Sequence, residues 1–207
     1  MTLYNPQPFA LTDRERALDL VEHVAFGTLV CTADGGEAEL AHLPFLVDRA
    51  RGLLLAHVAR ANGVWRRAER GEPMTAVFLG PHAYVSPLWY EHPDAQVPTW
   101  NYAAVHVHGH ARGPMDQVAV RELFDAMSRR FEAPGGWSLD RLPPELSRSL
   151  ARGVVGFSLA IERVDAKLKL SQNRSPTDHA RVERALATRG DDVGREVAEM
   201  MRAAPVR

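Results

Sequence analysis

Short apolar segments separated by turn residues are the feature that most limits what this chain can fold into. The segments are rich in Val, Leu, Ala and aromatic residues, and Gly, Pro, Asn and Asp lie between them, which is the pattern of strands and turns. The strand candidates are 28–32, 40–46, 53–57, 74–79, 83–85, 100–111 and 154–164. Many short strands with scattered helices predict a mainly β fold of the α+β class, a small barrel with helical additions.

Helices are expected between these strands and at the end of the chain. Thr12 and Glu15 have the spacing of a capping box, which predicts the start of a helix. Ser175 followed by Pro176 has the pattern of an N-cap with proline at the first helical position, and Gly190 is expected to interrupt the terminal helix. Further helical segments are expected at 64–70, 116–131 and 142–150.

Charge and composition exclude several classes of protein. The 207 residues carry a formal net charge of -1, so no overall positive field draws the chain to nucleic acid or to an anionic membrane. Cys31 is the only cysteine, which excludes an internal disulfide and fits a reducing compartment. Arg14, Glu15 and Arg16 lie where a signal peptide needs an apolar run, and no stretch approaches the roughly 18 apolar residues of a membrane span. The sequence therefore predicts a cytoplasmic protein without a membrane segment.

Lys167 and Lys169 are the only two lysines among the 25 basic residues. On an extended segment this spacing places both ammonium groups on one face, with Leu168 and Leu170 on the other. The polar residues 171–174 add hydroxyl, amide and guanidinium donors directly afterwards. This combination predicts a phosphate-binding segment. The alternative is a solvated basic end of a strand.

A second candidate site lies between His57 and Trp65, where a strand ends and a helix is expected to begin. Backbone amides at the start of a helix attract anions, and Arg60 lies directly before this start. His57, Arg60 and Asn62 therefore form a candidate anion pocket. The alternative is that Asn62 is a simple N-cap and Arg60 a solvated loop residue.

Trp100 and Tyr102 share one face of a predicted strand, whereas Asn101 points the opposite way. Two rings at this spacing suit stacking on a planar ligand. The alternative is that they fill a barrel or an interface.

Three histidines alternate along the same predicted strand: His106, His108 and His110. They spread over roughly 13 Å of extended chain and have no adjacent carboxylate, so they do not predict a metal site. We interpret them as a polar outer face of the strand.

Several of these stretches resemble, in order, the PaiB-type FMN-binding negative transcriptional regulators, which have the flavin-binding split barrel fold. The matching stretches are 1–9 with Tyr4, Pro6 and Phe9; 41–45; 57–62 with Trp65; 80–87 with Trp89 and Tyr90; 97–102; and 167–173. They cover nearly the whole chain except its last thirty residues or so. Gly63 departs from the family, which usually has proline there, and should loosen the local backbone.

The resemblance implies a homodimeric split barrel that binds FMN at the subunit interface. It implies a barrel domain at 1–174 and a helical extension at 175–207. By position, His57, Arg60 and Asn62 would contact the phosphate and ribityl end of FMN. Lys167, Lys169 and Gln172 would close this end of the site. Trp100, Asn101 and Tyr102 would lie near the ring system. The aromatic-rich stretch 89–102 independently favours a dimer interface.

Two kinds of function follow from this resemblance. One is a flavin-binding regulator without turnover, in which DNA binding rests on the resemblance alone, because the sequence has no recognisable helix-turn-helix and no basic face. The other is a flavin-dependent oxidoreductase of the pyridoxamine phosphate oxidase or flavin reductase type, or a haem-binding split barrel that would use the histidine-rich strand. No catalytic nucleophile with a positioned base is predicted, so flavin would carry any redox chemistry.

Overall fold

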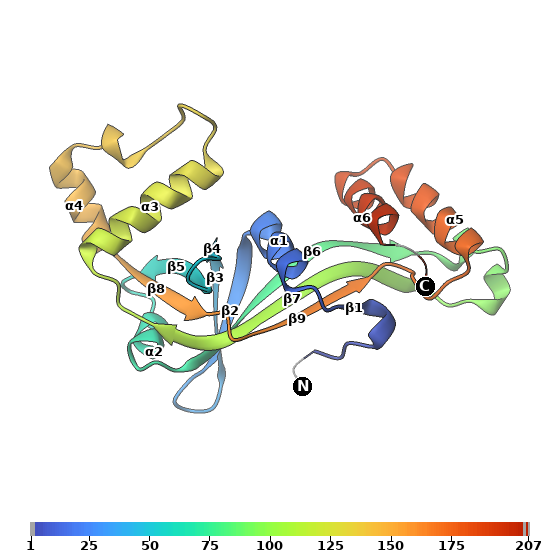
Figure 1. Ribbon diagram of the computed structural model, residues 1–207, viewed down its shortest axis with the longest axis horizontal. Helices are drawn as coiled ribbons and strands as arrows, with labels where there is room; N and C mark the ends of the chain where they lie inside the picture. Colours follow the sequence, from blue (N-terminus) through green and yellow to red (C-terminus); the bar gives the residue numbers. More distant parts are fainter. Residues whose placement is uncertain (1–2, 205, 207) are drawn as a thin grey trace. The chain divides into compact units, whose positions relative to one another are not determined.

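The computed structural model describes residues 3–204 and 206, so Met1 of the predicted N-terminal match lies outside the described residues. Antiparallel strands dominate the structure (Figure 1). The strands are β1 (Ala10–Leu11), β2 (Phe26–Thr32), β3 (Ala38–Pro44), β4 (Leu46–Asp48), β5 (Leu53–Ala59), β6 (Pro73–Val85), β7 (Thr99–Arg112), β8 (Val154–Ala160) and β9 (Arg163–Lys169). The expected mainly β, α+β architecture is confirmed.

The α-helices fall close to the predicted segments. They are α1 (Arg14–Val24), α2 (Trp65–Glu69), α3 (Gln117–Phe131), α4 (Pro144–Arg152), α5 (Pro176–Ala187) and α6 (Asp192–Ala203). The Ser175 side chain accepts a hydrogen bond from the Asp178 amide, which confirms the predicted N-cap of α5. Gly190 has a positive φ of 88° between α5 and α6, so the predicted break is also confirmed. None of the helices in the described residues is long and apolar enough to cross a membrane.

The strands form one sheet in the order β3-β2-β6-β7-β8-β5-β4, and β9 pairs with both β7 and β1. Along this path β3 lies at one end and β4 at the other, so the sheet is open within the described residues. The register between β5 and β8 runs from Leu53 opposite Ala160 to Ala59 opposite Val154. Adjacent strands are thus joined mainly by antiparallel pairing, which suits a split rather than a closed barrel.

Four local predictions were wrong. The single strand expected at 40–46 is divided between β3 and β4, which are separated at Phe45. Strand β6 continues through Gly80 and Pro81, although these residues were expected to separate two strands. A proline need not end a strand where its missing N–H has no partner to lose. Conversely, the single strand expected at 154–164 is divided between β8 and β9, so the two lysines lie within β9 itself. Helix α1 is capped by Asp13, which accepts hydrogen bonds from the Glu15 and Arg16 amides, and not by Thr12.

The chain divides into two compact units, and the predicted domain boundary at 174/175 stays a prediction. Unit 1 comprises Met1–Leu20, Leu79–His106 and Asp165–Arg207; unit 2 comprises Val21–Phe78 and Val107–Val164. Each unit has its own buried side chains. In unit 2 the rings of Phe45 and Phe78 pack edge to face with centroids 5.3 Å apart.

The core of unit 1 fixes the position of the lysine segment. Leu170 is fully buried in a cluster with Tyr90 and residues of α5 and α6, and Leu168 packs against the same cluster. Figure 1 shows α5 and α6 side by side near the end of β6. Because Tyr90 is only 1% exposed and Trp89 also packs on this core, these two rings do not support the dimer interface that was inferred from the stretch 89–102.

A buried arginine organises one edge of unit 2. Arg67 is 8% exposed, and its guanidinium contacts three carboxylates, those of Asp34 at 3.0 Å, Glu39 at 2.7 Å and Glu72 at 3.1 Å. Hydrogen bonds from Arg67 hold the pKa of Asp34 below its ordinary value. The pKa of Glu72 is lowered first by Arg70 and then by Arg67. One cation therefore balances several acids that would otherwise repel each other.

We expect Arg67→Met to lose more stability near neutral pH than in acid. Because the folded-state pKa values of Asp34 and Glu72 are lowered, their stabilising effect is present above the ordinary values of 3.8 and 4.5 and is lost as the pH falls below them. Urea unfolding at about pH 7 and about pH 3 measures the difference. Arg148→Met is the control, since Arg148 pairs with Glu145 on an exposed helix surface. An equal deficit at both pH values would contradict the electrostatic role of Arg67.

Candidate functional site

The two lysines on β9 lie beside β7 in unit 1. The Lys167 ammonium donates to the carbonyl of Tyr4 at 2.8 Å and lies 5.2 Å from the Tyr4 ring centroid and 5.5 Å from that of Tyr102. The Lys169 ammonium donates to the carbonyl of Trp100 at 2.8 Å and to the hydroxyl of Thr99. Both ammonium groups are therefore held beside the aromatic segment of β7.

Positive charge gathers at this position without a neutralising acid. In the residues that the structure describes, neither Lys167 nor Lys169 makes an ion pair; carbonyls, a hydroxyl and aromatic rings are their partners. Burial lowers the pKa of Lys169, and the positive charges of Lys167 and Arg174 lower it further. A bound anion would relieve this repulsion, so the arrangement favours a negatively charged ligand.

Exposed aromatic side chains lie on the strands next to the lysines. Trp100 is 51% exposed, and its ring contacts those of His82 and Tyr84 with centroids 6.2 and 6.1 Å away. The alternate residues of these strands, Ala83, Val85 and Asn101, are buried. We call this side of the sheet the open face of unit 1; it comprises the exposed His82, Tyr84 and Trp100, the half-buried Tyr102 and Lys169, and the buried Lys167.

Asn101 and Gln172 are buried and already paired. Asn101 donates to the Ser171 hydroxyl at 3.0 Å and also contacts the sulfur of Met201. Gln172 accepts from the Leu170 amide at 2.7 Å and donates to the Leu168 carbonyl at 2.6 Å. As predicted, Asn101 lies on the opposite side of the strand from Trp100 and Tyr102. In this structure Asn101 and Gln172 therefore hold the turn that follows the lysines.

In unit 2, Arg60 and Asn62 hold the loop between β5 and α2. The Arg60 guanidinium donates to the carbonyls of Arg152 at 2.8 Å and Val154 at 3.3 Å. The Asn62 side chain accepts from the Val64 amide at 3.1 Å. Arg60 is exposed, so its remaining donor capacity faces solvent.

His57 has a different environment from the two loop residues. Its ring lies 4.9 Å from that of Phe124, and its buried Nδ1 has no hydrogen-bond partner within the described part of the chain. Burial lowers the pKa of His57, which favours the neutral imidazole. A neutral ring can still donate or accept one hydrogen bond, but it adds no charge to an anion site.

The structure groups the predicted residues by unit. Trp100, Tyr102, Lys167 and Lys169 lie together on the open face of unit 1, with Asn101 and Gln172 behind them. His57, Arg60 and Asn62 belong to unit 2. That one ligand contacts both groups stays a prediction.

Sequence reasoning missed His82 and Tyr84 on the open face and Thr99 next to it. Thr99 supplies a hydroxyl to Lys169, and His82 packs against Trp100. The alternation of His82 and Tyr84 with the buried Ala83 and Val85 was the available signal, because residues at i and i+2 of a strand share a face. The prediction placed residues 83–85 and Trp100 in separate strands and did not pair these strands, so His82 and Tyr84 were not expected next to Trp100.

The histidine-rich strand has polar partners that the sequence did not reveal. His108 shares a hydrogen bond with the Thr75 hydroxyl at 2.9 Å, and His110 pairs with Glu162 at 2.9 Å. The statement that no carboxylate lies near these histidines was therefore wrong, because Glu162 reaches His110 from a distant part of the sequence. Among residues 3–204 and 206, no group of three or more His, Cys, Asp or Glu is arranged to hold a metal ion.

The antiparallel sheet with its helices defines the fold class as a split barrel. The fold is similar to the flavocytochrome Anf3 from Azotobacter vinelandii, with a TM-score of 0.64 and 16% identity over 83% of this chain and 75% of that chain. It is also similar to an FAD and haem binding protein from Mycobacterium smegmatis, with a TM-score of 0.61 and 20% identity over 77% and 73% of the two chains.

Sequence comparison identifies the family within this class. Residues 3–163 match the family model described as "Putative FMN-binding domain", and the chain belongs to this family. It is 35% identical to the protease synthase and sporulation protein PAI 2 of Bacillus subtilis over 96% of both chains. It is 25% identical to the protein AN0679 of Emericella nidulans over 78% of this chain and 80% of the other. The resemblance to the PaiB-type proteins is thus confirmed.

Proposed function

We propose that this protein binds FMN, with its phosphate at the lysine pair of unit 1. The observation that carries the proposal is the cluster of Lys167, Lys169 and Arg174, which has no carboxylate partner among the described residues and lies beside exposed aromatic rings. A flavin phosphate supplies the missing negative charge, and its ring system suits the aromatic part of the open face. The residues present therefore fit the cofactor that the family name indicates.

Each residue of the open face has a distinct role in this proposal. Lys167 and Lys169 bind the phosphate, while Trp100 and Tyr102 contact the ring system. Asn101 and Gln172 lie on the buried side of the sheet, and their hydrogen bonds position the turn that follows the lysines. His57, Arg60 and Asn62 complete the phosphate and ribityl end. Bound FMN would supply redox chemistry, whereas the chain itself binds and orients the cofactor.

We propose a regulatory role for this flavoprotein in the cytoplasm, without turnover of a substrate. The support comes from the relative in B. subtilis, whose name refers to protease synthesis and sporulation. The near-zero net charge of the chain gives little non-specific attraction to DNA, so we expect control to act through a partner or through weak, assisted DNA binding.

Spectroscopy and activity measurements test this function. The purified protein with FMN should give a flavin spectrum, should not oxidise NADH or NADPH faster than free FMN does, and should not shift DNA at physiological salt. Rapid NAD(P)H oxidation would favour the oxidoreductase alternative. Nanomolar binding to a specific operator in a gel-shift assay would overturn the expectation of weak DNA binding.

A haem-binding split barrel is the second candidate function. The observation that favours it is the histidine-rich segment of β7, where His110 is exposed and lies beside Glu162. Imidazole is a common axial ligand of haem iron. Titration with haemin should then give a Soret band that His110→Ala weakens. A spectrum identical to that of free haemin would exclude this function.

We expect the protein to be a homodimer. Large apolar side chains remain exposed in unit 1, including Leu88 at 76%, Val97 at 69% and Trp100 at 51%. Such residues are favoured in interfaces and are costly to leave in water. Light scattering should give about twice the chain mass of 22.9 kDa. A monomer that binds FMN with full affinity would contradict a site at the subunit interface.

A further inference from the structure

A hollow lies within unit 2 between α3, α4 and the segment that joins them. We call residues 117–152 the arm. The hollow has a volume of about 470 Å³, which is within the range of small-molecule pockets. Its lining is mostly apolar and includes Phe124, Met127, Phe131, Trp137, Leu142 and Leu150. None of these residues belongs to the open face of unit 1.

Apolar side chains of the hollow are left half exposed. Phe131 is 50% exposed, Trp137 43% and Leu150 54%, whereas Leu123, two turns before Phe131 on α3, is 2% exposed. The apolar surface of α3 therefore extends from the core into the hollow, where Met127 belongs to both and Phe131 lies at the exposed end. An apolar ligand would remove this surface from water.

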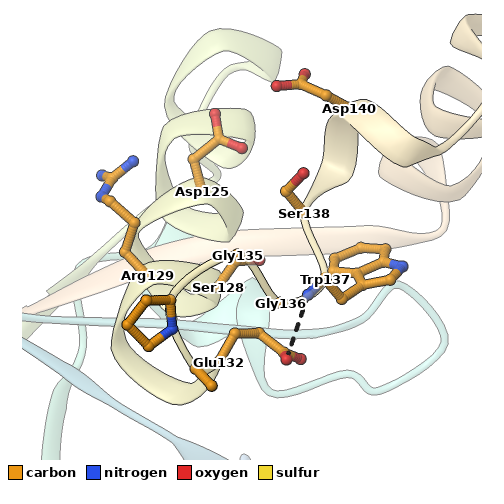
Figure 2. Close-up of a pocket in the computed structure, with 11 residues that line it drawn as sticks. Asp125, Ser128, Arg129, Glu132, Gly135, Gly136, Trp137, Ser138 and Asp140 are labelled. Carbon is orange, nitrogen blue, oxygen red and sulfur yellow. Dashed lines mark hydrogen bonds between the residues drawn. The ribbon is translucent and has the colours of Figure 1, made fainter.

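Glu132 provides an unneutralised negative charge at the edge of this hollow. Its carboxylate accepts a hydrogen bond from the Trp137 amide at 3.4 Å (Figure 2). A Cβ on Gly136 would lie 2.8 Å from the same carboxylate, so glycine leaves the room that the carboxylate occupies. In the part of the chain that the structure describes, Glu132 forms no ion pair. Figure 2 shows the guanidinium of Arg129 pointing away from it.

Two neighbouring acids, Asp125 and Asp140, form ion pairs, unlike Glu132. Asp125 and Asp140 line a second hollow that shares Ser128, Glu132 and Trp137 with the first. Both aspartates pair with Arg121, Asp140 at 2.6 Å and Asp125 at 3.9 Å. Among the described residues, the acid of this group without an ion pair is therefore Glu132, whose carboxylate accepts from the Trp137 backbone amide.

We propose that the hollow of the arm binds an aromatic organic cation. The ring system of the ligand occupies the apolar lining, and its positive charge lies between the Glu132 carboxylate and the Trp137 ring. An indole face and a carboxylate both attract organic cations, and the apolar walls exclude an inorganic ion. This site is a second ligand site, formed by residues that the flavin proposal does not use.

Two ligands of matched shape and opposite charge test the proposal. Tetraphenylphosphonium and tetraphenylborate are titrated by calorimetry into the full chain, with and without FMN. Tetraphenylborate is an aromatic anion, and the open face of unit 1 favours such a ligand, so the comparison that decides is the one made with FMN bound. We expect the phosphonium to bind at one site per chain and the borate to bind at least tenfold more weakly. Comparable binding of the two ligands, or no binding of the phosphonium, would overturn the proposal.

Variants of the full chain locate the site. Glu132→Gln removes the charge and Trp137→Leu removes the aromatic face while keeping an apolar side chain; each should weaken phosphonium binding about three- to tenfold. Glu145→Gln is the matched control, because Glu145 lies on α4 outside the lining and pairs with Arg148. Unchanged affinity in both test variants, or an equal loss in the control, would overturn the assignment.

Discussion

Gly109→Ala is expected to destabilise the protein by about 3 kcal/mol or more, which corresponds to a drop of roughly 6–12 °C in Tm for a chain of this length. Gly109 is a buried residue of β7, and a Cβ built there would lie 1.8 Å from the carbonyl oxygen of Ala160. The obstacle is backbone, not the end of a flexible side chain. Relief requires the end of β8 to move away from β7.

Thermal and urea unfolding of the variant measure this effect, with Gly35→Ala as the control. Gly35 lies in a turn of the same unit, and a Cβ there meets no atom within 4 Å. Alanine at Gly35 should therefore leave the free energy of unfolding within about 0.5 kcal/mol of the wild type. If the two variants unfold alike, the close approach of β7 and β8 is not a feature of the protein in solution.

Elements with a strong local pattern could be predicted from the sequence. Strand β7 matches the alternating segment predicted at 100–111, and α3 matches the amphipathic segment at 116–131 to within a residue. Ser175 and Pro176 likewise mark the start of α5 correctly. In each case the signal is a periodicity or a cap formed by residues close together in the chain.

Contacts between distant parts of the sequence could not be predicted in this way. The position of Lys167 depends on the Tyr4 carbonyl, and that of Lys169 depends on Thr99 and Trp100. Nothing in the local pattern of 167–174 identifies these partners. The same reason applies to Glu162 beside His110 and to the backbone contact at Gly109.

The environment of Lys167 and Lys169 could be described only when the sequence and the structure were combined. The sequence identified two lysines at i and i+2 but could not distinguish a phosphate site from a solvated strand end. The structure places Lys167 at 5% exposure and shows that burial and neighbouring cations lower the pKa of Lys169. A solvated strand end would be exposed, so this alternative is wrong for Lys167, and the phosphate site stays a prediction.

Lys169→Met is expected to weaken FMN binding about ten- to a hundredfold, because a charge-assisted contact to phosphate contributes roughly 1.5–3 kcal/mol. Methionine keeps a long apolar stem next to β7 and removes only the ammonium. Lys167→Met and Arg60→Ala test the other two predicted phosphate contacts. Lys167 also donates to the Tyr4 carbonyl, so thermal unfolding of its variant must accompany the titration.

Riboflavin separates loss of the phosphate contact from general damage to the site. It lacks the phosphate, so it should bind the wild type more weakly than FMN does and should hardly distinguish the wild type from Lys169→Met. Arg195→Met is the matched control, since Arg195 pairs with Asp192 on the exposed surface of α6 in the same unit. Quenching of flavin fluorescence gives both affinities. If the three variants bind FMN like the wild type, or if their affinity for riboflavin falls as much as their affinity for FMN, the lysine pair is not the phosphate site. The positive charge of the two lysines would then bind a different anion.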